Sequence, residues 1–408
     1  MKRIAVIGAG PAGMIAAAFA KTADTSVTVF DRNEKTGKKL YLTGKGRCNI
    51  TNIADRDGFM RNIPRNPRFL FSAFDGFFND DIIELIEGEG VRTKVERGGR
   101  VFPESDRSSD VIRALQSFAA RKGVAIRLDS RVQSVRKEGE EFILGFRGGA
   151  EAAFDAVIVA TGGMSYPSTG STGDGYAFAR SFGHTVTALR PSLVSLVTEE
   201  GWTGELAGLS LKNVTLTVTR GKKQLFSELG EMLFTHTGVS GPLVLSASAR
   251  IADDPAGVRL SIDMKPALDE QTLEARVMRD LEQNKHRQMK NAIMGLLPSR
   301  MVPIVLMEAG IDPEKTTDSF TKAERKRLVE TLKAIPLTVR DTAPIDEAII
   351  TRGGVSVKEI DPGTMESKLV PGLYFAGEVI DVDAYTGGFN LQIAYSTGAA
   401  AGRAAAEQ

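Results

Sequence analysis

The residues best suited to chemistry at the start of the chain form a glycine-rich turn between a strand and a helix. The apolar run 4–7 leads into Gly8, Gly10 and Gly13, and a second strand ends at Asp31. In this spacing the first glycine makes a tight turn, the second lets a pyrophosphate approach the backbone, and the third lets helix and strand pack closely. The helix amino terminus then faces the anion, and Asp31 can accept hydrogen bonds from ribose hydroxyls. The pattern predicts a dinucleotide site and leaves NAD and FAD open.

A polar segment, residues 32–52, follows this unit directly. It reads RNEKTGKKLYLTGKGRCNITN and carries six basic residues against one acid. The composition is typical of a solvated basic loop. The small and hydrogen-bonding residues in its second half would also let the backbone approach a flat polar ring beside a nucleotide site.

The second half of this segment, TGKGRCNITN, resembles the signature of the BaiN-like or YhiN-like flavoproteins, also called the aminoacetone-oxidase family of FAD-binding enzymes. In that family the loop lines the isoalloxazine ring, and serine usually stands where this chain has Thr43. The family's order continues in ATGG, TGDG, GEMLFTHTGVSGP and GLYFAGE, and the ATGG and TGDG strings are shared more loosely with fumarate-reductase-type flavoproteins. The resemblance covers nearly the whole chain and implies non-covalent FAD, rather than NAD, at the first site.

The fingerprint and the resemblance together predict which residues contact FAD. A valine in the family meets the adenine through its backbone, and Val132 matches that position. Glycines after the predicted strands 154–160 and 373–376 suit close approach of the cofactor. The predicted contacts are Gly8, Gly10, Pro11, Ala12, Gly13, Asp31, Arg32, Lys39, Gly46, Arg47, Cys48, Asn49, Thr51, Val132, Thr161, Gly162, Gly377, Glu378, Asp381, Gly388, Asn390 and Leu391.

The last helix is predicted over residues 388–406 and begins with the sequence GFNLQ. Its positive end, with bare backbone amides, can face the pyrimidine edge of the flavin, where negative charge gathers on reduction. A helix terminus stabilises such a charge by about 1 kcal/mol, so it would only adjust how easily the flavin is reduced. The hydride chemistry belongs to the flavin.

Strand and helix signals between these motifs divide the chain. Residues 191–267 and 336–350 contain short runs of alternating apolar and polar residues, whereas residues 268–335 have helical periods with proline stops. The ends, residues 1–190 and 351–408, together complete one sheet. We therefore predict an α/β fold: a Rossmann-like FAD-binding domain of the glutathione-reductase type, with an inserted antiparallel β-barrel-like domain and a helical subdomain.

One histidine, His236, is placed where chemistry could use it. It lies in the loop THTGVSGP of the insert, which the topology directs toward the flavin. Hydride transfer to or from carbon usually needs a proton moved on the opposite atom, and imidazole titrates nearest neutral pH. A histidine that only hydrogen-bonds its own loop explains the sequence at least as well. Arg47 and Tyr385, expected beside the ring, are the alternative catalytic residues.

The composition excludes several classes of protein. The 408 residues include 52 basic and 51 acidic side chains, so no global field favours nucleic acid or an acidic membrane. The single cysteine, Cys48, excludes an internal disulfide and a CxxC redox pair, and it suits a reducing cytoplasm. Three scattered histidines without an HExxH motif predict no metal site, and no uninterrupted apolar run is long enough to predict a membrane span.

These signals predict an FAD-dependent oxidoreductase that passes a hydride between flavin N5 and an organic substrate held between the flavin and the insert. Members of the resembled family have been associated with oxidation of a small amine, reduction of unsaturated steroid intermediates and dihydrouridine formation in ribosomal RNA. A basic segment, residues 284–300, could meet RNA phosphates, although a solvated helix face explains it better. A flavin-holding scaffold without turnover is the least favoured alternative. No second glycine fingerprint identifies NAD(P)H, which remains a candidate electron donor.

Overall fold

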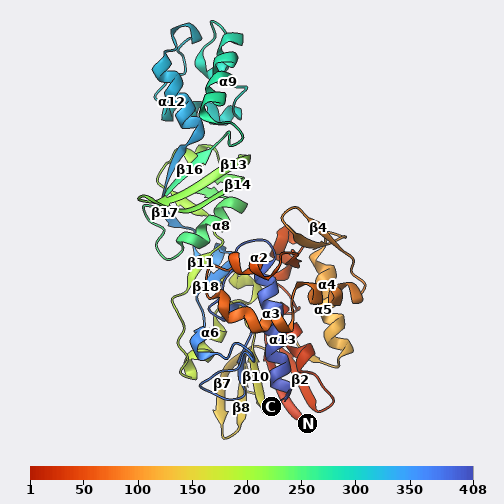
Figure 1. The fold of residues 1–408 in the computed structure, drawn as a ribbon. Helices are drawn as coiled ribbons and strands as arrows, with labels where there is room; N and C mark the ends of the chain where they lie inside the picture. Colours follow the sequence, from red (N-terminus) through yellow and green to blue (C-terminus); the bar gives the residue numbers. More distant parts are fainter. Residues whose placement is uncertain (408) are drawn as a thin grey trace. The chain divides into compact units, whose positions relative to one another are not determined.

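The computed structural model describes residues 1–407, which form two compact units (Figure 1). Residues 1–192 and 344–407 make the first unit, and residues 193–343 make the second. The second unit is therefore an insertion in the first. Separate barrel and helical domains within the insert remain a prediction.

A parallel five-stranded sheet forms the centre of the first unit, with the strand order β19-β10-β1-β2-β6. In its register, Ile4 lies opposite both Val27 and Ala156. The four residues of β10 are all apolar and buried, which is typical of a parallel strand covered on both faces. The sheet confirms the predicted Rossmann-like α/β fold. Its strands are β1 (Lys2–Ile7), β2 (Thr25–Phe30), β6 (Ala125–Arg127), β10 (Ala156–Val159) and β19 (Leu373–Phe375).

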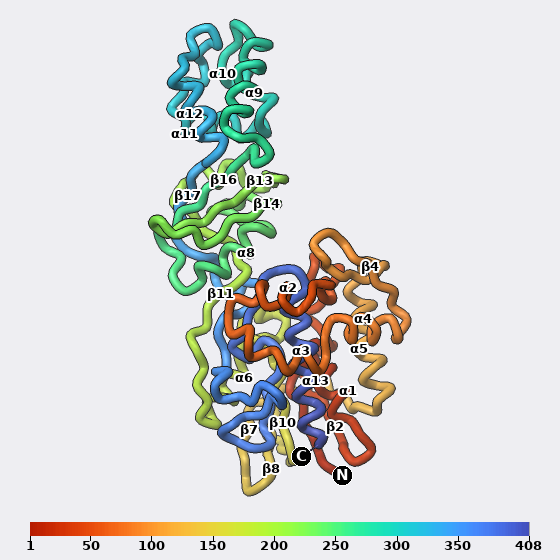
Figure 2. Tube along the Cα trace, viewed as in Figure 1, coloured from red at the N-terminus to blue at the C-terminus, as the bar shows by residue number. Residues whose placement is uncertain are grey.

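Two helices rich in small residues pack tightly against each other in this unit. They are α1 (Pro11–Ala20) and α13 (Phe389–Glu407). A Cβ at Gly398 would lie 2.5 Å from the carbonyl oxygen of Ala12, so glycine is what allows the two backbones to approach. Figure 2 shows the two ends of the chain at the same side of this unit. The carboxy-terminal segment is thus built into the amino-terminal fold.

Smaller elements complete the first unit. Antiparallel sheets are formed by β3 (Thr51–Asn52), β5 (Arg100–Pro103) and β4 (Thr93–Glu96), by β7 (Val132–Glu138), β8 (Glu141–Phe146) and β9 (Glu151–Phe154), and by β11 (Arg190–Ser192) with β18 (Ile350–Arg352). The remaining α-helices are α2 (Arg56–Arg61), α3 (Phe71–Gly76), α4 (Asn79–Gly88), α5 (Ser108–Arg121) and α6 (Asp174–Ser181). The backbone of Phe77 is extended and separates α3 from α4.

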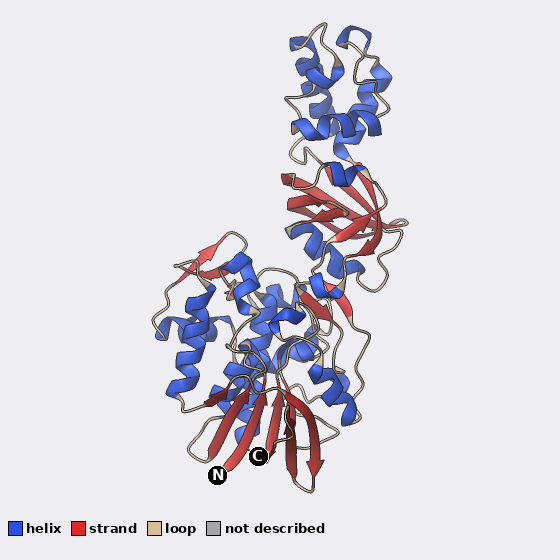
Figure 3. Cartoon of the chain, turned by 180° about the vertical axis from the view of Figure 1, so that it is seen from behind, coloured by secondary structure: helices blue, strands red, loops and turns tan. Residues whose placement is uncertain are grey.

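A closed antiparallel barrel forms the core of the second unit, with the order β12-β15-β14-β13-β16-β17 (Figure 3). Alternate residues of β13, namely Val214, Leu216 and Val218, are buried, as expected for a strand with one face toward the core. The barrel confirms the predicted antiparallel insert. Its strands are β12 (Leu196–Thr198), β13 (Ser210–Arg220), β14 (Lys223–Thr235), β15 (Gly238–Ser240), β16 (Arg259–Asp263) and β17 (Ile335–Thr342).

The helices of the second unit are α7 (Trp202–Glu205), α8 (Pro242–Ile251), α9 (Glu270–Gln283), α10 (Met289–Ala292), α11 (Val302–Glu308) and α12 (Lys322–Lys333). The last of them begins at a capping box in which Thr321 and Glu324 exchange hydrogen bonds. Within the predicted helical segment 268–335, α10 ends at Ala292, because Ile293 leaves helical backbone geometry. Across residues 1–407, no helix combines the length and apolarity needed to cross a bilayer.

Candidate active site

The glycine fingerprint forms the turn between β1 and α1, at the carboxyl edge of the parallel sheet. Gly8 has a left-handed backbone (φ 110°), and side chains at Gly8 or Gly13 would collide with backbone carbonyl oxygens. A Cβ at Gly10, in contrast, would meet no atom within 4 Å. Two glycines therefore permit close packing, while the third borders open space where the fingerprint predicts a pyrophosphate.

The amino terminus of α1 has the chemistry of an anion site. Gly10 is its N-cap and receives no side-chain hydrogen bond, Pro11 takes the first helical position, and the first turn has no acidic residue. Asp31, at the end of β2, accepts from the amides of Ala9 and Asn33 at 2.7 and 2.8 Å and so fixes the turn. Its contact with a ribose remains a prediction.

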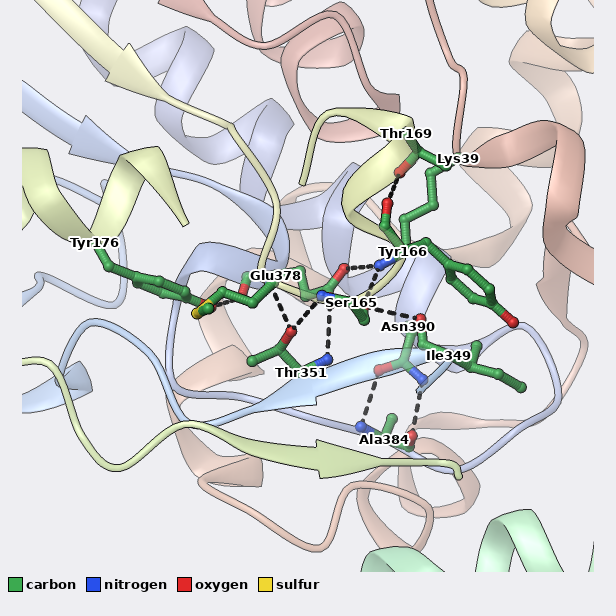
Figure 4. Close-up of polar contacts among 11 residues, drawn as sticks. Lys39, Ser165, Tyr166, Thr169, Tyr176, Ile349, Thr351, Glu378, Ala384 and Asn390 are labelled. Atoms are coloured by element: carbon green, nitrogen blue, oxygen red, sulfur yellow. Dashed lines mark hydrogen bonds and ion pairs between the residues drawn. The ribbon is translucent and has the colours of Figure 1, made fainter. Parts of the chain in front are cut away.

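Glu378 is the centre of a polar cluster just after β19 (Figure 4). Its Oε2 accepts from Lys39 Nζ at 2.8 Å, and its Oε1 accepts from the Thr351 amide at 2.8 Å and the Ser165 hydroxyl at 3.1 Å. Lys39 also donates to the Ser165 hydroxyl at 2.7 Å. A Cβ at Gly163 would lie 2.8 Å from Glu378 Oε1, which explains the glycine beside the cluster. The charges of Lys39 and Glu378 thus compensate each other at the sheet edge.

Ser165 and Thr351 were missed as site residues by the sequence reasoning. Each follows or precedes a pair of glycines, in the strings TGGMS and TRGG, and that proximity was the only available signal. Thr351 Oγ1 also accepts from the amide of Met164 at 2.7 Å. The two hydroxyl residues therefore hold the segment after β10 against β18.

Several other predicted cofactor residues lie at the same sheet edge. Thr161 and Gly162 follow β10, and the Thr161 hydroxyl is buried without a hydrogen-bond partner among residues 1–407. Gly377 follows β19 in a left-handed conformation, where a Cβ would lie 2.8 Å from the Cβ of Ala12 on α1. Val132 is the buried first residue of β7. The turns after β1, β10 and β19 thus meet where open α/β sheets bind ligands.

The polar loop predicted to line the flavin is tightly bound to the protein. Cys48 is fully buried in a left-handed conformation, and burial raises the pKa of its thiol to about 12, so the thiol stays protonated and is a poor nucleophile. With the Asn49 side-chain amide oriented so that its oxygen and nitrogen are both satisfied, it accepts from the Gly388 amide at 2.9 Å and donates to the Thr51 carbonyl at 3.0 Å. Gly46 ends the preceding 3-10 helix with φ 86°. The expectation of a bare amide at Gly388 is thereby corrected, because Asn49 accepts its hydrogen bond.

Two arginines of the predicted set are engaged by acids. Both terminal nitrogens of Arg47 donate to Glu96 at 2.9 Å, and the guanidinium lies 4.1 Å from the centre of the Phe102 ring. Arg32 lies 3.6 Å from the Asp174 carboxylate and donates to the Thr172 hydroxyl at 2.6 Å. These contacts favour positioning roles, and a catalytic role for Arg47 remains a prediction.

The loop 381–388 leads from the Glu378 cluster into α13 and is fixed at several points. The carboxylate of Asp381 forms a bidentate pair with the Arg65 guanidinium. The Asn390 side chain accepts from the Ala384 amide at 2.9 Å and donates to the Ala384 carbonyl at 2.7 Å. Because both side chains bond to the protein, any contact of this loop with a cofactor falls largely to its backbone.

The start of α13 is tied to the polar loop. Thr51 donates to the side chain of Gln392 at 2.7 Å, and both residues are buried. Leu391 packs partly buried against the core that contains Cys48. Tyr385 is buried, and its amide donates to the Asn62 carbonyl at 2.9 Å. The structure therefore brings the loop 46–52 and the first turn of α13 together.

Asp383 is a buried acid that the sequence reasoning placed only in a polar turn. The residue is 1% exposed, and its Oδ2 accepts from the Ser192 hydroxyl at 3.2 Å. Its Oδ1 is buried without a hydrogen-bond partner among residues 1–407. Burial raises the pKa of this carboxyl to about 6. No local sequence pattern distinguishes it from the exposed acids of other turns.

His236 lies in the second unit, in the turn between β14 and β15. Its side chain is exposed, whereas the hydroxyl of the preceding Thr235 is buried without a hydrogen-bond partner in the described part of the chain. The three histidines belong to different segments, and residues 1–407 contain no group of three or more His, Cys, Asp or Glu side chains that could hold a metal ion. A proton-transfer role for His236 remains a prediction.

The basic segment 284–300 is largely neutralised within the second unit. Lys285 pairs with Glu282, and Lys290 pairs with Glu314 at 2.5 Å. The Arg300 guanidinium donates to backbone carbonyls near α7. Arg287 is exposed. The charge that could meet phosphates is therefore smaller than the sequence suggests.

The comparisons with known proteins bear on this site. The chain matches the family described as HI0933-like protein Rossmann domain over residues 2–404. It belongs to that family. The chain is 32% identical over 413 aligned positions to a 3-dehydro-bile acid delta(4,6)-reductase of Clostridium scindens, with all of both chains covered. It is also 33% identical over 392 positions to a ribosomal RNA dihydrouridine synthase of Escherichia coli, covering 96% of this chain and 95% of the other.

One solved structure, a 3-ketosteroid delta1-dehydrogenase from Sterolibacterium denitrificans, matches with a TM-score of 0.51 at 14% identity, and both chains are covered completely. At that identity the likeness concerns the fold alone. The resemblance of this HI0933-like chain to the BaiN-like flavoproteins is confirmed. Family, fold, fingerprint and reductase relative make the chain a flavin-dependent oxidoreductase with FAD as its cofactor.

Proposed function

We propose that this protein reduces a carbon–carbon double bond conjugated with a carbonyl group. The proposal rests on one observation, that the bile-acid relative and the ribosomal RNA relative have names describing this same bond change on unlike substrates. A 3-keto-4,6-diene steroid and a uracil ring both contain an alkene carbon that accepts hydride, because the conjugated carbonyl takes up the negative charge. Both substrates therefore need the same reacting groups.

The residues proposed to hold FAD converge on the carboxyl edge of the parallel sheet. We assign the pyrophosphate to the α1 terminus at Gly10, the ribose to Asp31 and the adenine to the backbone of Val132. The loop 46–52 and the first turn of α13 are assigned to the isoalloxazine, whose reduced form the positive helix end favours. When bound, FAD supplies the hydride at flavin N5.

The insert is proposed to act on the substrate carbonyl. His236 would donate a hydrogen bond to the carbonyl oxygen as negative charge develops there, which is a role that imidazole can fill near neutral pH. Its exposed position in a turn supports such a role, since a substrate could reach the ring. Tyr385 is the alternative, and Arg47 is less suited because Glu96 and Asp106 hold its guanidinium.

A small carbonyl compound is the preferred substrate class. The reductase relative matches over the full length of both chains, and two of the cations that would bind RNA, Lys285 and Lys290, are paired with acids. Reduction of uridine in ribosomal RNA is the second candidate, favoured by the name of the Escherichia coli relative. We propose NADH or NADPH as the electron donor. We also propose the cytoplasm as the compartment, because the single cysteine is a free, buried thiol, which suits a reducing environment.

Anaerobic stopped-flow measurements test the proposal. FAD-loaded protein would first be mixed with NADH or NADPH and then, once reduced, with a 3-keto-4,6-diene steroid, a small amine-derived imine or a ribosomal RNA transcript. We expect rapid flavin reoxidation with the steroid. Reoxidation by the imine alone would contradict the proposal, and reoxidation by RNA alone would transfer it to the second candidate.

A further inference from the structure

Asp383 is a buried acid with an unmet hydrogen-bonding need in the loop between Glu378 and α13. One carboxyl oxygen accepts a hydrogen bond from Ser192, and the other has no partner in the described part of the chain. An ionised carboxylate in such surroundings loses its hydration without full compensation. The neutral acid costs less and carries a proton that it can donate. The geometry thus favours a carboxyl group that holds a proton reversibly.

The charged groups around Asp383 act in opposite directions. Arg352 on β18 and Arg65 favour the ionised form and lower the pKa, whereas the neighbouring carboxylate of Asp381 raises it. The Ser192 hydroxyl also favours ionisation, but burial is the largest effect and brings the pKa to about 6. Arg65 is itself bound to Asp381, so its charge is largely compensated. The carboxyl group can therefore take up and release a proton near physiological pH.

Continuous contacts within the first unit connect Asp383 to the Glu378 cluster. Ser192, its hydrogen-bond partner, is the last residue of β11, which pairs with β18 so that Ser192 lies opposite Ile350. The next residue of β18, Thr351, donates its amide to Glu378. The loop that holds Asp383 also runs directly into the first turn of α13. One two-stranded ladder thus joins the carboxyl group to the proposed cofactor edge.

We propose that Asp383 donates the proton that accompanies hydride transfer, an inference that rests on the proposed reduction of a conjugated double bond. A bound, reduced FAD would supply the hydride to the alkene carbon farther from the carbonyl, and Asp383 gives its proton to the adjacent carbon. The alkene gains two electrons and two hydrogens, the flavin becomes oxidised, and Asp383 becomes a carboxylate that takes a proton back from water.

The test compares Asp383→Asn with Asp361→Asn in FAD-loaded protein. Asparagine keeps the size of the side chain and can still bond to Ser192, but it cannot give a proton to carbon. Asp361 is a matched control, because its carboxylate accepts from the amides of Gly363 and Thr364 in a turn of the same unit and has no proposed part in the site. Flavin content and thermal unfolding would first be measured for each protein.

The rate of reoxidation by a 3-keto-4,6-diene steroid is the first readout. We expect Asp383→Asn to lower it by about 10²- to 10⁴-fold, the range of a general acid, while the control stays near wild type. In the wild-type protein this rate should fall as pH rises through about 6, because the donor loses its proton, and Asp383→Asn should remove this inflection. A wild-type rate and pH profile in Asp383→Asn would overturn the donor role.

Infrared spectroscopy gives a readout that needs no turnover. A protonated carboxyl band should titrate with a midpoint near 6 in FAD-loaded wild-type protein and be absent from Asp383→Asn. Persistence of the band in that variant would overturn the assignment. Should Asp383→Asn fail to fold, Asp383→Glu should retain the band with a shifted midpoint, and an unshifted band would also overturn it. If neither the steroid nor a ribosomal RNA transcript reoxidises the wild-type flavin, the proposed function fails and the donor role with it, whereas a defect limited to the variant supports both.

Discussion

The polar groups of the two units are used in contrasting ways. In the first unit, Glu378, Asn49 and Asn390 are fixed by hydrogen bonds to other segments of the chain. In the second unit, His236 is exposed in a turn, and Lys285 pairs with an acid on its own segment. Groups fixed in advance suit one cofactor, since little reorganisation is needed when charge develops. Exposed groups in a turn can differ between relatives with unlike substrates.

The number of charged residues in a segment of sequence also differs from the charge that the folded protein leaves available for binding. The basic segment of the insert contains a run of cations without an acid, yet Lys290 reaches Glu314 and Arg300 reaches backbone carbonyls. Asp383, in contrast, is inconspicuous in the sequence and is the buried acid with the pKa raised to about 6. The more reactive group is thus defined by tertiary burial, which a charge count does not reveal.

The largest expected effect concerns the proposed FAD site of the first unit. Gly10→Val should yield colourless protein, because a branched side chain would fill the space assigned to the pyrophosphate. The fold should survive, since the residue has an extended backbone and its Cβ would meet no protein atom within 4 Å. Flavin absorbance per chain after gel filtration measures the loss.

Gly88→Val is the matched control for this change. Gly88 ends α4 and is exposed, and a Cβ added there would likewise meet no atom within 4 Å, so this variant should keep its FAD. Full flavin content in Gly10→Val would reject the pyrophosphate assignment. Acid precipitation should release FAD from the wild-type protein, because the Cys48 thiol is buried and protonated; yellow colour in the pellet would instead indicate a covalent bond.

The next effect tests whether His236, the exposed histidine of the second unit, takes part in the reaction. His236→Ala should slow the substrate half-reaction by at least about 100-fold, if the ring donates to the substrate carbonyl. FAD content and melting temperature should not change. His286→Ala is the control, since His286 is also an exposed histidine of the same unit and its ring pairs with Asp318. If His236→Ala and His286→Ala have the same half-reaction rate, His236 takes no part in the reaction, and the proton donor must be sought among residues of the first unit.

Much of the fold could be predicted from the sequence because its signals are local. The first strand, turn and helix follow from the spacing of Gly8, Gly10 and Gly13, and β13 shows its alternation in the order of its residues. The candidate site was predicted less completely. Ser165 and Thr351 meet at Glu378 only through the sheet order, and Lys290 meets Glu314 only because the turn 313–315 is hydrogen-bonded to the start of α10. Such pairings between distant segments have no local periodicity.

A smaller effect is expected from reversing the basic segment. The triple change Lys285→Glu, Arg287→Glu and Lys290→Glu should leave FAD content and steroid reduction within about twofold of wild type, because two of these cations already pair with acids. Filter binding with a ribosomal RNA transcript at several salt concentrations completes the test. A steeply salt-dependent RNA affinity that disappears in the triple variant would show that these cations contact phosphates, because the salt dependence reports the release of counterions. It would contradict the view that their charge is largely neutralised within the second unit.

The smallest effect concerns His184, which is buried after α6. Its Nε2 lies 2.8 Å from the Ser367 hydroxyl oxygen, and its ring packs edge-on against Phe375 of the central sheet. Burial lowers the pKa of His184, although Glu359 opposes the shift. The folded pKa thus lies below the unfolded value of about 6.5, so the folded state binds fewer protons, and stability is lost as pH falls through about 6.5 toward the folded pKa.

Urea denaturation of FAD-loaded protein at about pH 8 and about pH 5.5 measures this loss. We expect His184→Gln to lose less stability between the two pH values than wild type, because glutamine can replace the hydrogen bonds of neutral imidazole but does not titrate. His286→Gln is the control, since it makes the same substitution at an exposed histidine. The comparison between variants removes the contribution of the other groups that titrate in this window. An equal loss in wild type and His184→Gln would show that His184 is protonated as readily in the folded as in the unfolded protein, against the effect expected from its burial.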